Sequence, residues 1–145
     1  MRKSLLIAVD FDGTIVEDAY PKVGKAKPFA IETIKMLQND GHRIILWTYR
    51  HGRALKEAHQ FMIDSGIEPY AVNRSYPEEA AHPSDVSRKI NADLFIDDRN
   101  FGGFPGWGEI YQKLNKDGQA PKPKRRGFFG YLHLIYRTKV AVAIV

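Results

Sequence analysis

Asp10-Phe11-Asp12-Gly13-Thr14 places two carboxylates two residues apart, directly after a short apolar run. Residues at this spacing point to the same side of an extended chain, so both acids can face one small volume. Two like charges held close together repel unless a cation neutralises them or one stays protonated. An ionised, metal-bound Asp10 would then serve as a nucleophile, and Asp12 would donate and accept a proton. Gly13 permits a tight turn, and Thr14 starts the next helical turn or donates a hydrogen bond to a bound anion.

An ordinary Asp-Gly turn with solvated acids is the alternative interpretation, and polar residues near the other apolar runs argue against it. Thr48 ends one run and offers a hydroxyl to a phosphoryl oxygen, although threonine is also a frequent strand residue. Lys89 is expected to neutralise a phosphate, but the neighbouring Arg88 competes for that role. Asp97 and Asp98 end another run, where two adjacent acids are costly unless they face water or a cation. They add the hard oxygen ligands that Mg²⁺ requires.

A second anionic group of a substrate has candidate partners as well. Arg50 follows the second apolar run together with His51 and Arg53, and we expect it to grip such a group. A solvated first turn of a helix is the alternative interpretation of these basic residues. The same mouth can be lined by residues that follow the third and fourth runs, namely Asn73, Arg74, Tyr76, Arg99 and Asn100.

In this order, the motifs resemble those of the haloacid dehalogenase superfamily of phosphohydrolases. The string 10–14 is similar to the first motif of that superfamily, Thr48 to the second, and Lys89 to the third. Asp97-Asp98 is similar to the paired-acid form of the fourth motif. The resemblance covers residues 4 to about 116, and the short distance from Lys89 to Asp97 makes the third motif the least typical.

The resemblance implies a mechanism and a cofactor. Asp10 would attack a phosphate monoester in line, and water would hydrolyse the aspartyl-phosphate with help from Asp12. Mg²⁺ would be held by Asp10, the backbone carbonyl of Asp12 and Asp97, with Asp98 acting directly or through water. The second acid of the first motif marks phosphatases in that superfamily, so Asp12 also argues against a dehalogenase.

The elements that must position these residues are predicted from hydrophobic periodicity. We expect strands at 4–10, 43–47, 70–72 and 93–96, and helices at 28–40, around 55–62 and at 108–116. Strands that alternate with helices predict a single Rossmann-like α/β domain with three layers, in which helices cover both faces of a mainly parallel sheet. Ligands bind at the carboxyl ends of the strands in such sheets, where the polar residues lie.

The chain is long enough for one catalytic domain, which we expect over residues 1–118, and too short for two. No cap domain is expected, because 15–27 leaves room for a small flap and 49–88 is used by one helix, one strand and a loop. A site without a cap either accepts a large phosphorylated substrate, such as a polymer or glycoconjugate, or is closed by a neighbouring subunit.

Composition narrows the class of protein further. The chain has 145 residues, a net charge of +5 and no cysteine, which excludes a disulfide scaffold, a thiolate nucleophile and an iron–sulfur cluster. We expect no export signal, because the apolar run 5–9 is short and ends at an acid. A cytoplasmic location fits both observations.

The basic charge lies at the end of the chain. From Lys122 onward there are six Lys and Arg residues and no Asp or Glu, so the preceding residues are nearly neutral. The role of this tail, 119–145, stays open between packing on the sheet, a dimer surface, an anionic membrane surface and nucleic acid.

The leading hypothesis is a magnesium-dependent phosphatase that acts on a phosphate monoester. One alternative is a non-catalytic metal-binding module that recruits a partner through its tail. Another is a polynucleotide end-phosphatase that uses the basic tail to hold its substrate. The residues do not choose among sugar, nucleotide, lipid-linked and protein phosphates.

Overall fold

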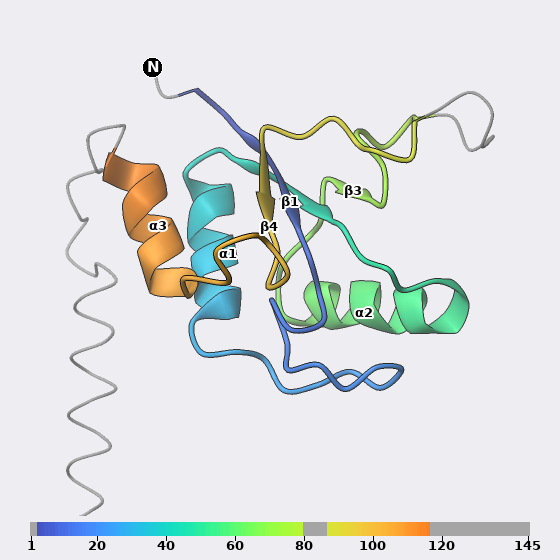
Figure 1. Cartoon of the computed structure of the whole chain (residues 1–145). Helices are drawn as coiled ribbons and strands as arrows, with labels where there is room; N and C mark the ends of the chain where they lie inside the picture. Colours follow the sequence, from blue (N-terminus) through green and yellow to red (C-terminus); the bar gives the residue numbers. More distant parts are fainter. Residues whose placement is uncertain (1–2, 80–86, 117–145) are drawn as a thin grey trace, which may run out of the picture. The chain divides into compact units, whose positions relative to one another are not determined.

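The computed structural model describes residues 3–79 and 87–116. Its elements are β1 (Leu6–Val9), α1 (Ala30–Asn39), β2 (Arg43–Leu46), α2 (Gly52–Asp64), β3 (Ala71–Val72), β4 (Leu94–Ile96) and α3 (Trp107–Lys116) (Figure 1). The chain forms two compact units, Met1–Gln112 and Lys113–Val145, and the boundary between them falls within α3. The tail 119–145 lies outside the described residues.

The four strands form one parallel sheet in the order β3-β2-β1-β4. β1 lies inside the sheet, where Ala8 pairs with Ile45 of β2 on one side and with Phe95 of β4 on the other. The predicted α/β fold with a parallel sheet is confirmed. Because β1 and β4 are parallel neighbours, the residues that follow them emerge at the same edge of the sheet.

The strands form where the sequence has continuous apolar runs, which suit strands that are buried on both faces. Ile7 and Val9 are completely buried in β1, as are Ile44 and Leu46 in β2. β1 is shorter than the predicted 4–10. At its start the N–H of Leu5 donates to the imidazole of His42 rather than to a strand.

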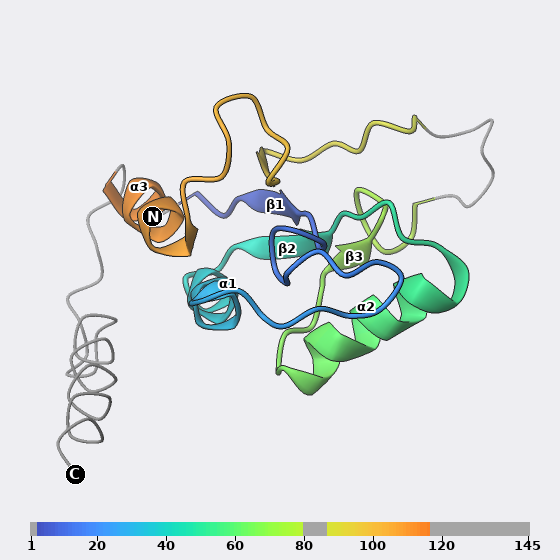
Figure 2. The same ribbon diagram turned by 60° about the horizontal axis from the view of Figure 1, so that its bottom comes forward.

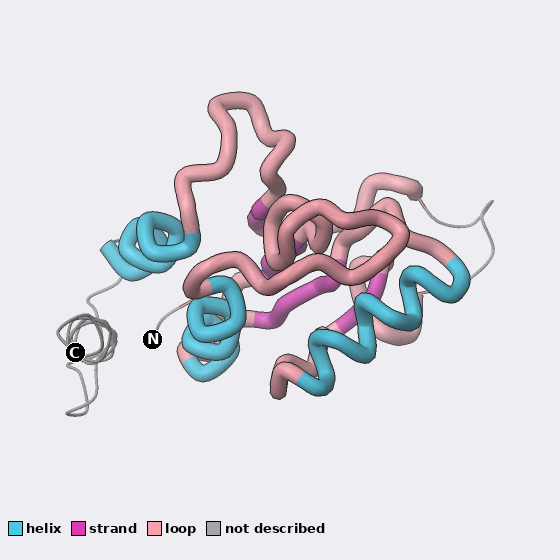
Figure 3. Tube along the Cα trace, turned by 90° about the horizontal axis from the view of Figure 1, so that it is seen from below, coloured by secondary structure: helices cyan, strands magenta, loops and turns pink. Residues whose placement is uncertain are grey.

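One face of the sheet is covered by the two helices that connect its strands. α1 and α2 lie on the same side of the sheet, as Figures 2 and 3 show. Ile34 and Leu37 of α1 and Met62 of α2 are completely buried. These side chains recur at helical spacing, which explains why the sequence predicted both helices.

The other face of the sheet carries a smaller core cluster. Ala8, Ile45 and Ala71 of the strands belong to it together with Ile90, and Ala92 packs against them. Residues 90–92, which form neither helix nor strand, therefore cover part of this face.

Residues 15–27 form the small flap that the sequence predicted. The N–H of Glu17 donates to the carbonyl of Lys25 at 2.8 Å, and the N–H of Lys27 donates to the carbonyl of Ile15 at 2.8 Å. These bonds make the two arms of a short hairpin, which we call the flap hairpin, with residues 18–24 at its tip. No helix within residues 3–79 and 87–116 is both long and apolar enough to span a membrane.

Candidate active site

The structure brings three predicted metal ligands together at the carboxyl edge of the sheet. Asp10 follows β1, and Asp97 and Asp98 follow β4. Val9 pairs with Ile96, and the N–H of Asp10 donates to the carbonyl of Ile96 at 2.9 Å, so the two strand ends are held side by side. One carboxylate oxygen from each acid lies within 4.8 Å of those of the other two. These three residues are the acid cluster.

Thr14 joins the two parts of the acid cluster through its hydroxyl group. Its hydroxyl donates to Oδ2 of Asp10 at 3.0 Å and accepts the N–H of Asp98 at 2.9 Å. The residue is completely buried, so its hydroxyl has no access to a substrate. The prediction that Thr14 binds substrate is corrected: it positions two of the acids.

Gly13 has a similar supporting role. Its φ is +84°, in the left-handed region that glycine adopts without strain. A side chain here would collide with the carboxylate of Asp98. Gly13 is buried and does not line the cleft described below, so the prediction of a substrate contact is corrected to a role in making space for Asp98.

The acid cluster places three like charges in partly buried surroundings. Burial is the largest cause that raises the pKa of Asp10, to about 7, and the charges of Asp97 and Asp98 raise it further. The hydrogen bonds from Thr14 and the backbone of Phe11 act in the opposite direction and lower it. A carboxylate in this position is stabilised by a cation.

A divalent cation fits these residues. Oδ1 of Asp98 is buried and has no hydrogen-bond partner among the described residues, which is costly for a carboxylate oxygen. A cation beside it would remove that cost. The donors of Asp10, Asp97 and Asp98 are all oxygens, the type of ligand that Mg²⁺ prefers.

Asp12 lies outside the acid cluster because its side chain is bound to Arg50. Nε of Arg50 donates to Oδ2 of Asp12 at 2.6 Å, and Nη2 donates to Oδ1 at 2.7 Å. Asp12 still lines the cleft. The resemblance to the haloacid dehalogenase superfamily implies that Asp12 binds the metal only through its backbone carbonyl. The ion pair with Arg50 uses the side-chain oxygens and does not involve that carbonyl.

Arg50 is not placed to bind a substrate. Its side chain is completely buried, and its five N–H donors have partners within the protein. The prediction that it grips a second anionic group is therefore corrected. In the sequence it resembled the neighbouring His51 and Arg53, which are exposed.

Thr48 lies after β2, at the same edge of the sheet as the acid cluster. Its N–H donates to the side-chain oxygen of Asn73 at 2.8 Å, and its hydroxyl accepts the N–H of Arg50 at 3.2 Å. Asn73 follows β3 and has a φ of +51°, a conformation that asparagine adopts more readily than most residues. Thr48 also lines the cleft described below.

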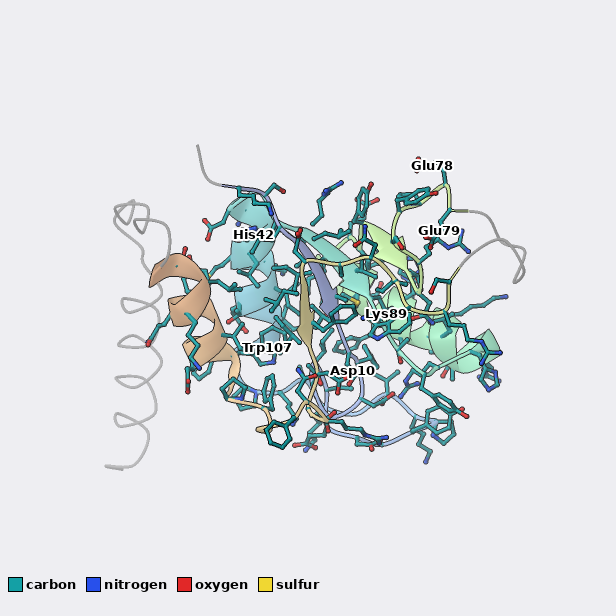
Figure 4. All side chains as sticks on the ribbon, turned by 45° about the horizontal axis from the view of Figure 1, so that its top comes forward. Asp10, His42, Glu78, Glu79, Lys89 and Trp107 are labelled. Carbon is teal, nitrogen blue, oxygen red and sulfur yellow. The ribbon has the colours of Figure 1, made fainter. Side chains whose placement is uncertain are left out.

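An open cleft of about 1170 Å³ lies in front of these residues. Its lining comes from the residues that follow each of the four strands, from the flap hairpin and from the connection between β3 and β4. The residues are Asp10, Asp12, Asp18, Tyr20, Trp47, Thr48, Tyr49, Asn73, Arg74, Glu79, Ser87, Arg88, Asp97 and Arg99. Arg88 lines the cleft and Lys89 does not, so the geometry favours Arg88 as the cation that faces a substrate. Figure 4 labels Lys89 and Asp10, with Lys89 above Asp10 in that view.

Comparison with known proteins shows that the chain is similar to a solved structure. No family model matches the chain, and no curated protein matches it. A solved structure described as "Structure of the conserved protein coded by locus from Bacteroides thetaiotaomicron" is 51% identical to it with a TM-score of 0.74. The match covers 81% of this chain and 94% of that chain.

The chain belongs to the family of that conserved Bacteroides protein. Membership supports the fold described above, and the description of the Bacteroides protein names no activity. The proposed chemistry of this family member therefore rests on its own residues.

Two residues of this family member support the site in ways that the sequence did not reveal. Trp107 is buried at the start of α3, and its indole N–H donates to the carbonyl of Thr14 at 2.9 Å. Asn73 was expected only to line the mouth, and it also holds Thr48. The signal in the sequence for the contact between Trp107 and Thr14 was a tryptophan directly after the turn-rich stretch 102–106.

Proposed function

We propose that this protein is a magnesium-dependent phosphatase that hydrolyses a phosphate monoester. The observation that carries the proposal is the acid cluster beside an open cleft, with a buried oxygen of Asp98 that has no partner in the described chain. Mg²⁺ bound by these acids would neutralise charge on the phosphoryl group. Phosphoryl transfer needs little beyond such neutralisation and alignment.

In the proposed reaction, an oxygen of Asp10 attacks the phosphorus opposite the leaving oxygen. Asp12 first binds a proton from solvent. A phosphorus–oxygen bond to Asp10 then forms, the bond to the leaving oxygen breaks, and the leaving oxygen takes that proton from Asp12. Water then attacks the phosphorus of the aspartyl-phosphate and returns a proton to Asp12, which releases inorganic phosphate and restores Asp10. The hydroxyl of Thr48 and the guanidinium of Arg88 are suited to hold the phosphoryl oxygens.

The cleft lining supports a substrate larger than a phosphate ion. Arg74 and Arg88 come from the two ends of the connection between β3 and β4, and Arg99 comes from the loop after β4. Within the described residues none of the three forms an ion pair. Tyr20 and Tyr49 also line the cleft and are 46% and 89% exposed. We therefore propose a phosphorylated substrate with further negative charge and a ring or chain that the two tyrosines can contact.

Turnover of an aryl phosphate with Mg²⁺ tests the proposal. Asp10→Asn is expected to abolish turnover while circular dichroism shows an unchanged fold, because the amide cannot act as the nucleophile. Asp64→Asn is the matched control, since Asp64 is an exposed acid near the end of α2. Full turnover by Asp10→Asn would overturn the proposal.

The same experiment separates the alternatives when it is extended to a panel of phosphates. Magnesium binding without turnover of any phosphate would favour a non-catalytic metal-binding module. Turnover confined to phosphorylated oligonucleotide ends would favour the polynucleotide end-phosphatase. We place the activity in the cytoplasm, in keeping with the absence of cysteine from the sequence.

A further inference from the structure

Arg50 is the largest completely buried side chain among the described residues, and it is charged. Burying a charge is costly unless other groups compensate it. The guanidinium lies 5.0 Å from the ring centre of Phe11 and 5.4 Å from that of Tyr20, which allows cation–π contact with both. The burial of this charge therefore suggests that Arg50 has a specific role in the structure.

The guanidinium joins three separate parts of the chain. It binds both carboxylate oxygens of Asp12, which follows β1. It also donates to the carbonyls of Pro21 at 2.9 Å and Lys22 at 2.6 Å, at the tip of the flap hairpin. A weaker bond of 3.4 Å reaches the carbonyl of Ala54 in the first turn of α2.

Only a planar group with five donors can make this set of bonds. A lysine offers three donors from a single nitrogen and cannot bind a carboxylate in a fork while it reaches two carbonyls on another segment. The hydrogen bond to Asp12 is also the largest cause that raises the pKa of Arg50, so the group stays charged.

We infer that Arg50 is a positioning residue that fixes the orientation of the Asp12 carboxylate and holds the flap hairpin closed against it. The inference rests on the proposed function for its catalytic part. Arg50 acts through Asp12, because it is not part of the acid cluster and does not itself line the cleft. The rate of the chemical step and the closure of the hairpin should therefore depend on Arg50, while magnesium affinity should not.

A double-mutant cycle on aryl phosphate turnover tests the catalytic part. Arg50→Lys is expected to lower kcat by about tenfold to a hundredfold, because a small displacement of a catalytic group is costly. In an Asp12→Asn background the same substitution is expected to cause no further loss of kcat. An equal loss in both backgrounds, or unchanged kcat in Arg50→Lys, would overturn the catalytic part.

Amide hydrogen exchange tests the closure of the hairpin and needs no activity. The N–H groups of Glu17 and Lys27 bridge the hairpin arms, and Arg50→Lys is expected to speed their exchange by about tenfold as the tip is released. Arg53→Lys is the matched control, because Arg53 is exposed and pairs with Glu57 nearby. Unchanged exchange in Arg50→Lys would overturn the closure.

A second variant covers the case in which Arg50→Lys does not fold. Asp12→Ala removes both oxygens that Arg50 binds, and it is expected to speed exchange at the same two amides. Unchanged exchange in Asp12→Ala would again overturn the closure. If the wild-type protein turns over no phosphate, the proposed function fails while the exchange measurements still decide the role of Arg50 in the hairpin.

Discussion

The carboxylate of Asp98 occupies the space beside Gly13 that the β-carbon of any other residue at position 13 would fill. The two residues follow different strands, β4 and β1, so this contact joins the two halves of the acid cluster. The absence of a side chain at position 13 is therefore a requirement of the site and not only of the turn.

Gly13→Ala is expected to displace Asp98 and to weaken magnesium binding by about tenfold or more, the range found when groups that orient metal ligands are altered. Isothermal titration with Mg²⁺ measures the change. Gly41→Ala is the matched control, because Gly41 has a φ of +91° and open space around it. If both variants bind Mg²⁺ equally well, the collision with Asp98 has no effect on the site.

Thr14→Val keeps the shape of the side chain and removes its two hydrogen bonds. It is expected to cost about 1–3 kcal/mol of unfolding free energy, because the N–H of Asp98 loses its partner. Thr33→Val is the control, since Thr33 is completely buried and its hydroxyl has no partner in the described residues. Urea unfolding should show a loss in the first variant and none in the second; equal effects would contradict the role of Thr14.

The raised pKa of Asp10 predicts a pH dependence of stability in the absence of metal. Its pKa of about 7 in the folded protein exceeds the ordinary 3.8, so between these values the folded state holds a proton that the unfolded state releases. The contribution of Asp10 to stability is therefore present below about pH 4 and is lost as the pH rises through 7.

Urea unfolding in a chelator, from pH 4 to pH 8, checks this sign. The difference in stability between Asp10→Asn and the wild type should grow in favour of the variant as the pH rises, because the amide carries no charge. Mg²⁺ at pH 8 should restore the wild type and leave Asp10→Asn largely unaffected. A difference that does not change with pH would show that Asp10 titrates normally.

Arg88 and Lys89 are neighbours in the sequence, but their substitution is expected to change KM to different extents. Arg88→Ala is expected to raise KM for a phosphorylated substrate by about tenfold, because Arg88 lines the cleft and under the proposed function would bind the phosphate. Lys89→Ala should leave KM within about twofold of the wild type, since its side chain is exposed and does not line the cleft. Steady-state kinetics of both variants decides between them, and the reverse pattern would restore Lys89 as the third motif.

Hydrophobic pattern was sufficient to predict the strands and helices and the edge at which the site forms. The apolar runs end at Asp10, Thr48 and Asp97, and parallel strands bring their carboxyl ends to one edge. The packing of Ile90 and Ala92 on the sheet could not be predicted, because so short an apolar pattern is not distinguished from a loop.

The supporting residues could not be predicted because their partners are distant in the sequence. Arg50 has the same local setting as its basic neighbours, and only the fold brings it to Asp12 and the hairpin tip. Thr14 was predicted to bind an anion because the position of Asp98, eighty-four residues away, was unknown. Sequence patterns reveal which residues are reactive, whereas the direction of each side chain is set by tertiary packing.

In the described sheet, β4 is an edge strand of three residues that pairs with β1 alone. Asp97 and Asp98 are anchored to this short strand, so a cation shared with Asp10 would fasten the edge of the sheet to its interior. Folding and cation binding would then be thermodynamically linked, with about 2.7 kcal/mol gained when free Mg²⁺ exceeds its dissociation constant a hundredfold. Under the proposed function, removal of magnesium would loosen β4 before β1, and Asp97 and Asp98 would then separate from Asp10.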